Sequence, residues 1–434
     1  MTLVWVAAKI FMTTIKHTSK TVFEKLIQPI SGLIDNCNYQ RNCKTLSDQQ
    51  WIETGLLRTI CKESSGREFL QRLIDSGRSV IKRSHFFETL KSKRRLNLCR
   101  EVSSALYHKL SDNKYISDPF SQFTELNDYD IYAGDGHYHS AAAHDIRKGG
   151  KKYPTLHFYS VNLRTNGLNH LTLADTSGGR KKEHDMRALK RLDINTLRQG
   201  SPKGRKVLYV WDRAGIDFRQ WFNWKHSSGI YFISREKKNM DLQTMGYITY
   251  DSEDTINKGV ESFTLAGTST GVIVNKIEFK CPISGERFNF ITNLLNVPPG
   301  LVAYIYKTRW NIEKIFDQVK NKLNEKKAWA STDTAKTMQA QFVCMTHNLM
   351  LILDKQLEIA GLQNQIENKR REKRLNKTIL KSKLNKDELP IFLTTPKRPV
   401  LRSVKFIRWL RNNLFSSTSW REALLSLKLV YDVF

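Results

Sequence analysis

The spacing of hydrophobic residues changes along this 434-residue chain. Through residues 20–127, apolar side chains recur every three or four positions, which predicts amphipathic helices. The stretch SDQQWIETGLLRTICKES, residues 47–64, begins with a serine that can cap a helix, and residues 84–110 continue the same periodicity. The first region is therefore predicted to be helical.

The middle of the chain has the pattern of a sheet. Residues 155–175, TLHFYSVNLRTNGLNHLTLAD, predict two strands joined at Asn166-Gly167, because Asn-Gly is a strong signal for a tight hairpin. After a probable helix at 183–192, the short apolar run in RKVLYVWDRAG is typical of a buried strand that ends at Asp212. GIYFISREKK, residues 229–238, predicts another strand. This order of elements indicates an α/β fold with a mixed sheet.

Strand and helix patterns alternate again towards the C-terminus. Residues 236–299 are rich in Thr, Val, Ile and Phe, which predicts several antiparallel strands inserted into the fold. The segment NVPPG then introduces a helix at 306–323, and residues 334–357 predict an apolar helix that packs on a sheet. A strongly basic run at 369–386 precedes two further predicted helices within 403–429.

The predicted helix at 306–323, YKTRWNIEKIFDQVKNKL, carries a polar stripe. Its residues lie at steps of three, four and seven, so at about 100° per residue they fall within roughly 60° of one another; they are Tyr306, Arg309, Glu313 and Lys320. An apolar flank that includes Phe316 lies beside them and is predicted to face the core. Taken alone, the stripe could be an ordinary solvated face.

Charge narrows the range of partners. The chain has 71 Lys and Arg against 42 Asp and Glu, a formal net charge of +29. Such an excess favours a polyanionic partner, above all nucleic acid, over an anionic membrane surface. The basic helix at 84–110 and the run at 369–386 are candidate contacts, although either could be a solvated charged face.

Targeting signals and cysteine patterns point to the cytoplasm. No apolar run reaches the roughly 18 residues that a membrane span needs. The N-terminal apolar stretch lacks a preceding basic segment and contains Lys9, which argues against a signal peptide. The six cysteines are scattered without a CxxC pair, which fits a reducing compartment better than a disulfide framework or a zinc finger.

Three acidic residues from separate segments are candidate metal ligands. Asp135 lies between two glycines in AGDGHYH, Asp212 ends a predicted buried strand, and Glu313 belongs to the polar stripe. Phosphodiester cleavage by metal ions requires carboxylates that converge from different segments, and Mg²⁺ prefers such hard oxygen ligands. Each residue alone is weak evidence, because an aspartate at a strand end is more often a cap or turn residue, and Asp317 is a weaker alternative ligand.

Together these motifs resemble a known family. The spacing Tyr-x2-Arg-x3-Glu-x6-Lys of Tyr306, Arg309, Glu313 and Lys320 is similar to the signature of bacterial DDE transposases of the fourth insertion-sequence family. GDG around Asp135 and DRAG around Asp212 resemble the two aspartate motifs of that family. The resemblance covers roughly residues 128–350.

The resemblance implies an RNase H-like catalytic core and a specific chemistry. Asp135, Asp212 and Glu313 would be the catalytic residues and would bind Mg²⁺, with Mn²⁺ as a substitute. Tyr306, Arg309 and Lys320 would contact DNA phosphates. The protein would bind the terminal inverted repeats of an insertion sequence, cut at the ends and join the 3′-OH to target DNA, acting as a homodimer on double-stranded DNA in the nucleoid.

The resemblance also suggests domain boundaries. They are a helical DNA-binding region at 1–127, a first core part at 128–235, a β-strand insertion at 236–299, a second core part at 300–354 and a basic helical region at 355–434 that contacts DNA or mediates dimerisation. Two alternatives stay open: a nuclease that cuts without joining, and a catalytically silent DNA-binding protein derived from a transposase.

Two aromatic features beside these motifs have less specific interpretations. His137, His139 and His144 crowd Asp135, so a zinc site is a minor alternative to structural or DNA-contacting roles. Trp310 is predicted to pack against the sheet. An aromatic residue could also stack on a flipped base, as in enzymes that this family resembles, but the sequence does not identify which one.

Overall fold

A computed structural model places most of the chain. It describes residues 20–63, 65–78, 81–111, 118–146, 150–175, 183, 185–323, 327–362, 365–383, 389–393 and 404–432. The N-terminal stretch considered as a signal peptide lies outside these residues. In the part that is described, no helix is long and apolar enough to cross a membrane.

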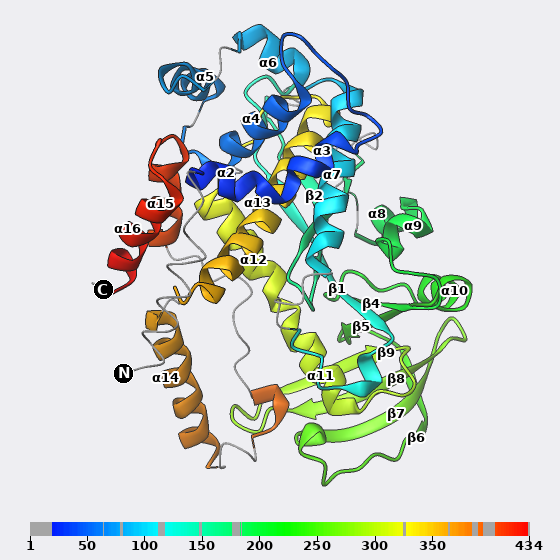
Figure 1. Cartoon of the computed structure of the whole chain (residues 1–434). Coiled ribbons are helices and arrows are strands. Elements are labelled where there is room, and N and C mark those ends of the chain that lie inside the picture. Colours follow the sequence, from blue (N-terminus) through cyan, green and yellow to red (C-terminus); the bar gives the residue numbers. More distant parts are fainter. Residues whose placement is uncertain are drawn as a thin grey trace.

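A single mixed sheet of nine strands forms the centre of the described structure (Figure 1). The strand order is β3-β2-β1-β4-β5-β9-β8-β7-β6, and β1, β4 and β5 run parallel while the other neighbours are antiparallel. The strands are β1 (Tyr129–His139), β2 (Thr155–Asn162), β3 (Leu168–Leu173), β4 (Lys206–Val210), β5 (Ile230–Arg235), β6 (Leu242–Tyr247), β7 (Val260–Thr268), β8 (Ile273–Lys280) and β9 (Arg287–Thr292). The predicted α/β fold with a mixed sheet is confirmed.

The predicted hairpin is present as β2 and β3. Asn166 adopts a positive φ of 61° in the turn, as a tight connection requires. The strands expected within 236–299 are also present, but they do not form a separate sheet. Strand β9 pairs with β5 through residues such as Ser234 and Ile291, so β6–β9 extend the central sheet.

Helices surround the sheet, and in the described residues they both precede and follow it along the chain. The longer ones are α4 (Asp48–Ile60), α5 (Gly66–Asp75), α7 (Lys93–Ser111), α10 (Phe218–Ser228), α11 (Pro299–Thr308), α12 (Trp310–Lys322), α13 (Asp333–Ile359), α14 (Gln365–Ser382), α15 (Val404–Leu414) and α16 (Trp420–Asp432). The shorter ones are α2 (Val22–Ile27), α3 (Ser31–Asp35), α6 (Arg83–Thr89), α8 (Asp185–Arg191) and α9 (Ile194–Arg198). Helices α2–α7 gather at one end of the molecule and strands β6–β8 at the other (Figure 1).

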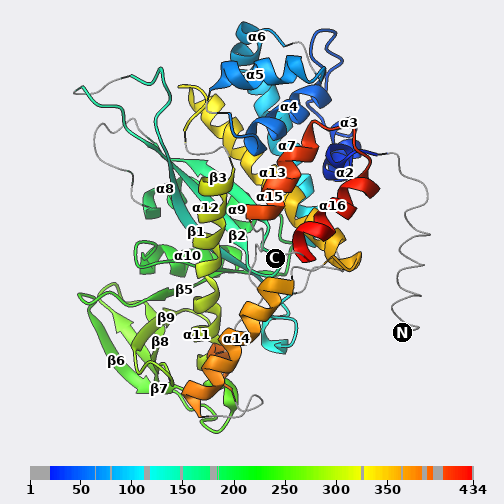
Figure 2. The same ribbon diagram turned by 90° about the vertical axis from the view of Figure 1, so that its left-hand side faces the viewer.

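The first and last helices of the described structure pack against each other. Helices α15 and α16 both contact α2. The backbone N–H of Trp420 donates to the carbonyl of Lys20 at 2.8 Å, and Thr21 forms an isolated bridge with Ser419. The C-terminal helices therefore complete the N-terminal helical region (Figure 2).

Part of the basic helix at 84–110 has a structural role. Arg94 donates two hydrogen bonds of 2.7 Å to the carboxylate of Asp48, which is only 2% exposed. Arg95 is buried and lies 3.6 Å from the same carboxylate. A buried acid needs such partners, because desolvating an unpaired carboxylate is costly. These two arginines are consequently engaged in a structural ion pair, and DNA contact by the rest of this basic region stays a prediction.

Helix α13 is buried along most of its length, yet it carries polar residues that hold loops. Asn348 donates to the carbonyl of Leu168 at 3.0 Å and accepts from its N–H at 2.9 Å, as a neighbouring strand would do. Lys336 pairs with Asp145 at 3.2 Å, with both side chains almost fully buried. The helix packs on the sheet as predicted, and in addition its buried polar side chains bind neighbouring segments.

The buried ion pair between Lys336 and Asp145 gives a first prediction. Replacing Lys336 with alanine should lower the free energy of unfolding by about 3–5 kcal/mol, because it leaves a buried carboxylate uncompensated. Lys91→Ala removes the exposed partner of Glu88 and should cost less than about 1 kcal/mol. Urea unfolding of both variants measures the difference, and equal small effects would show that Asp145 can reach water.

Candidate active site

The two candidate aspartates lie at the same edge of the sheet. Strands β1 and β4 are parallel neighbours, and Ala133 is paired with Val210. Asp135 and Asp212 each follow these partners by two residues. Because parallel strands run side by side in the same direction, this register brings both carboxylates to adjacent positions at the carboxyl end of β4.

The pKa of Asp135 reflects both its burial and the nearby charge of Asp212. Burial is the main reason why its pKa is raised to about 6. The neighbouring charge of Asp212 adds to the rise in pKa, while a 2.7 Å hydrogen bond from the Gly136 N–H and the nearby Arg309 oppose it. Mutual repulsion of this kind is expected of acids that share a cation site.

The backbone around Asp212 is fixed by several contacts. The Ala214 N–H donates to Oδ1 of Asp212 at 2.7 Å, and the Ser234 hydroxyl on β5 donates to its carbonyl oxygen at 2.8 Å. These two bonds hold the turn after β4 against the next strand. Ser234 was not identified from the sequence, because the contact depends on how β5 pairs with β4.

Trp211 links the two aspartate motifs. Its indole is buried and lies so close to Gly134 that a Cβ atom there would come within 2.1 Å of the ring. Gly215, on the far side of Asp212, is also packed against Trp211. The glycine before Asp135 is therefore required for close packing with the residue before Asp212, and this packing sets the distance between the two segments.

Glu313 comes from a helix that is interrupted. Helix α11 ends before Arg309 and α12 begins after it, where the sequence predicted one continuous helix. Around this point two backbone hydrogen bonds join residues that are three positions apart. The Arg309 N–H donates to the Tyr306 carbonyl at 3.1 Å, and the Ile312 N–H donates to the Arg309 carbonyl at 3.0 Å. Helices α11 and α12 follow each other along the sheet (Figure 2), and α12 contacts β1 and β2.

The segment between α12 and α13 is hydrogen-bonded to the end of β1. The N–H of Ala328 donates to the carbonyl of Ser140 at 2.9 Å, one residue beyond β1. The buried amide of Gln339 on α13 holds the same segment, accepting from the Trp329 N–H at 2.9 Å and donating to the Lys327 carbonyl at 3.1 Å. The Glu313 helix is thus anchored to the strand that carries Asp135.

Arg309 lies between the acidic residues. Its Nη2 donates to Oε1 of Glu313 at 2.9 Å, and its side chain is almost completely buried. Burial alone would lower the pKa of Arg309, but the charges of Glu313 and Asp135, together with Tyr306, raise it above its ordinary value. Arg309 therefore contributes positive charge to Glu313 and to Asp135 at once.

The polar stripe is less exposed than the sequence indicated. Tyr306 packs its ring 5.1 Å from Phe290, and both Tyr306 and Arg309 are buried, so the alternative of an ordinary solvated face does not hold for these two residues. Lys320 is exposed and Glu313 is half-buried. The four residues therefore do not share one solvent-facing surface.

Of two neighbouring aromatic residues that were predicted to be packed, one is buried and the other is exposed. Phe316 is buried and stacks on His137 at a centroid distance of 4.7 Å, as predicted for the apolar flank. Trp310 is 53% exposed, so the expectation that it packs against the sheet is wrong. The guanidinium of Arg309 lies 5.7 Å from the Trp310 ring centroid.

The histidines near Asp135 form a buried array across β1, β2 and β3. His139 stacks on His157 at 4.0 Å, and His157 is 3.1 Å from His170 through ring nitrogens. Burial is the main cause of the lowered pKa of both His157 and His170, to about 3 for His170. Apart from its position near Asp135, this array resembles an ordinary buried polar cluster.

The donor set suits a hard divalent cation. Within the described residues, no group of three or more His, Cys, Asp or Glu side chains is arranged to hold a metal ion, and this includes the three candidate carboxylates. Mg²⁺ often uses only one or two protein carboxylates and completes its shell with water and substrate phosphate. Asp135 and Asp212, with adjacent positions and coupled charges, fit that pattern, and Glu313 is connected to them through Arg309.

Comparison with known proteins identifies the family. The family described as "Transposase DDE domain" matches residues 127–349, about half of the chain. The chain belongs to the DDE transposases. The match begins just before β1 and ends within α13, so it covers the sheet and all three candidate carboxylates.

A relative supports the assignment. The protein named "Putative transposase y4zB" from Sinorhizobium fredii is 24% identical over 154 residues, which is 33% of this chain and 42% of that protein. The chain thus covers less than half of the relative's length. With the family established, the mixed sheet flanked by helices is an α/β core of the RNase H-like transposase type.

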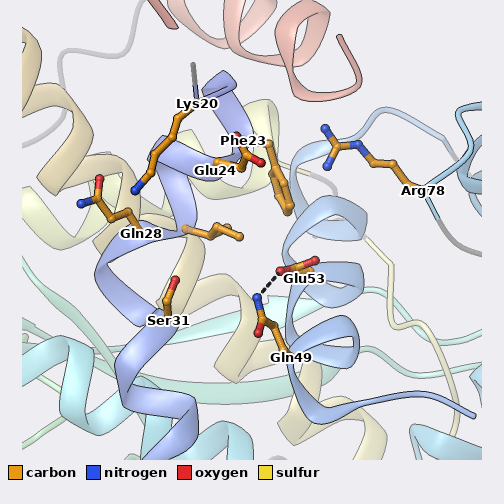
Figure 3. Close-up of a pocket in the computed structure, with 9 residues that line it drawn as sticks. Lys20, Phe23, Glu24, Gln28, Ser31, Gln49, Glu53 and Arg78 are labelled. Atoms are coloured by element: carbon orange, nitrogen blue, oxygen red, sulfur yellow. Dashed lines mark hydrogen bonds between the residues drawn. The ribbon is translucent and has the colours of Figure 1, made fainter. Parts of the chain in front are cut away.

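Two cavities in the described part of the chain lie away from the acidic residues. One of about 360 Å³ lies between α2 and α4 and is lined by residues that include Phe23, Glu24, Glu53 and Arg78 (Figure 3). Another of about 610 Å³ runs along β3 and includes His170 and Gln341. Asp135, Asp212 and Glu313 line neither cavity.

The packing of Trp211 on Gly134 leads to a prediction. Gly134→Ala should destabilise the transposase by roughly 1–3 kcal/mol or more, because the added methyl must displace a buried indole. Gly32→Ala, in a helix with nothing within 4 Å of the added atom, should be neutral or slightly stabilising. Thermal melts compare the two, and an unchanged Gly134→Ala protein would contradict the proposed packing.

The histidine array predicts a dependence of stability on pH. A lowered pKa in the folded state means that the unfolded chain binds more protons, so stability is full above about pH 6.5 and falls towards the folded pKa. Each such histidine should contribute a slope of about 1.4 kcal/mol per pH unit between about 6.5 and 5.

His170→Asn isolates this contribution. The variant should show a shallower loss of stability on acidification than the wild type, by about one such histidine. Asp135, whose raised pKa has the opposite effect between about pH 4 and 6, is common to both proteins and cancels. Parallel slopes in urea unfolding at several pH values would contradict a neutral, buried His170.

Proposed function

We propose that this protein is the transposase of an insertion sequence that cuts DNA at the element's ends and joins the 3′-OH to target DNA. The observation that carries the proposal is the register of β1 and β4, which brings Asp135 and Asp212 together inside a transposase DDE domain. Glu313, joined to the same site by Arg309, completes the acidic set.

The proposed chemistry follows from the residue types. Asp135, Asp212 and Glu313 would hold Mg²⁺, or Mn²⁺ in its place, which activates the attacking hydroxyl and stabilises the leaving oxygen of the phosphodiester. Water attacks in the cleavage step and a DNA 3′-OH in the joining step. The three acids are half-buried, so part of the bulk solvent is excluded and their electrostatic attraction for a cation is stronger.

DNA binding is supported by the distribution of exposed basic residues. Lys320 on α12 and Arg213, next to Asp212, are exposed near the acids. Helix α14 carries exposed basic residues along its length, among them Lys369, Lys373, Lys377 and Lys381. With a net charge of +29, contacts with phosphates would supply most of the non-specific affinity.

The exposure of Trp310 also supports a nucleic-acid substrate. The indole of Trp310 offers an exposed aromatic surface one residue from Arg309, suited to stacking on a base of the bound end. Pairing of two ends would require two copies of the chain, which makes a homodimer part of the proposal.

Asp135→Asn tests the function. It should reduce cleavage and strand transfer to background while leaving DNA binding intact, because the carboxylate holds the metal and does not contact the duplex. The substrate is a labelled duplex that carries an inverted repeat found beside the coding region, with Mg²⁺ and a target plasmid. Asp75→Asn, which changes an exposed acid at the end of α5, is the matched control.

The products separate the proposal from its alternatives. Strand-transfer product joined to the plasmid identifies a transposase, whereas cleavage without joining identifies a nuclease of the same fold. Binding without either reaction in the wild-type protein would indicate a silent DNA-binding protein. Retention of cleavage by Asp135→Asn would remove this residue from the catalytic set.

A further inference from the structure

Arg309 occupies a position that is unusual for a DNA-contacting residue. It is 6% exposed, whereas Lys320, from the same polar stripe, is exposed on α12. Its guanidinium is enclosed by the rings of Tyr306 at 5.6 Å and Trp310 at 5.7 Å. A phosphate could not reach this group in its present position without a rearrangement of the side chain.

The charge of Arg309 is directed at the acidic site. Nη2 binds Oε1 of Glu313 at 2.9 Å, in a pair whose arginine side is buried and whose glutamate side is about one-third exposed. Pairs at this spacing on exposed helix faces contribute little, but burial removes the screening by water. The same guanidinium also acts on Asp135, across from α12 on β1.

One part of the guanidinium is not satisfied. The Nε–H of Arg309 is buried and has no hydrogen-bond partner in the described structure. A buried donor without a partner is costly, and a forked acceptor such as a phosphate matches two adjacent N–H groups of arginine. The present partners of Arg309 therefore satisfy only part of its guanidinium, and a phosphate could supply the acceptor that the Nε–H lacks.

We propose that Arg309 is a resident counter-ion that competes with divalent metal for Glu313 and releases this carboxylate when a DNA phosphate takes its place. The proposal rests on the metal-dependent function proposed above. In this proposal Arg309 has a positioning role before the reaction. It neutralises Glu313 while no DNA is bound, and its guanidinium pairs with a substrate phosphate instead when DNA binds.

This exchange couples two binding events. A divalent cation bound to Glu313 would lie next to the positive guanidinium, so each opposes the other while Arg309 remains in place. A phosphate that draws Arg309 away removes the opposition, and DNA binding then raises the affinity for metal. By linkage, metal raises the affinity for DNA by the same factor. The protein would hold metal loosely until an end is bound.

The coupling predicts an effect with an unexpected sign. Arg309→Met removes the charge but keeps an apolar side chain of similar length, and the DNA-free variant should bind Mn²⁺ about tenfold more tightly than the wild type. Arg309→Lys keeps the charge and should bind Mn²⁺ about as weakly as the wild type. Lys203→Met, which removes an exposed charge from the loop before β4, should have no effect.

Isothermal titration of the full-length protein with MnCl₂, in the absence of DNA, measures these affinities. The rise in melting temperature caused by Mn²⁺ gives a second readout, since a ligand that binds only the folded state stabilises it. A purely structural role for Arg309 would weaken metal binding in Arg309→Met or leave it unchanged, and either result overturns the proposal.

Two further outcomes are interpretable. If Arg309→Met does not fold, Arg309→Gln, which is also neutral but keeps amide donors, replaces it; failure of both to fold shows that the ion pair is structural, and the proposal is wrong. If wild type and Asp135→Asn bind Mn²⁺ equally, the metal site itself is misplaced. That result refutes the proposed function and is distinct from a failure of the Arg309 exchange.

Discussion

The parallel pairing of β1 with β4 is the constraint on which the site depends. One register brings two carboxylates to adjacent positions, and a shift of one residue would turn one of them to the opposite face of the sheet. Trp211 packed on Gly134 and the Ser234 hydroxyl on the Asp212 carbonyl both fix this arrangement. Repulsion between the acids is the energetic consequence, and Arg309 offsets part of it.

The third acid depends on longer connections. Between Asp212 and Glu313 the chain passes through β5, crosses four antiparallel strands and returns in α11. The chain that follows the Glu313 helix is attached to the sheet by the hydrogen bond from Ala328 to Ser140 and by polar residues of α13. Buried polar groups on that helix act as specific attachment points, which an apolar helix could not supply.

Much of this architecture could be predicted from the sequence, and the exceptions have physical causes. The Asn166 hairpin, the buried strand before Asp212 and the buried Phe316 follow from local patterns of turn chemistry and periodicity. The interruption at Arg309, the burial of Tyr306 and the exposure of Trp310 do not, because they arise from tertiary contacts. The inward orientation of Arg94 depends on Asp48, which is distant in sequence. The spacing of the four stripe residues suggested a common face but could not show a helix boundary within it.

The packing of α15 and α16 on α2 has a consequence for the order in which the protein is made. Synthesis proceeds from the N-terminus, so α2 emerges from the ribosome long before its partners near residue 420 exist. The first helical region can reach its final packing only after α15 and α16 have been synthesised. Any activity that requires this packing is therefore withheld from a nascent chain, even one in which all three acidic residues have already been incorporated.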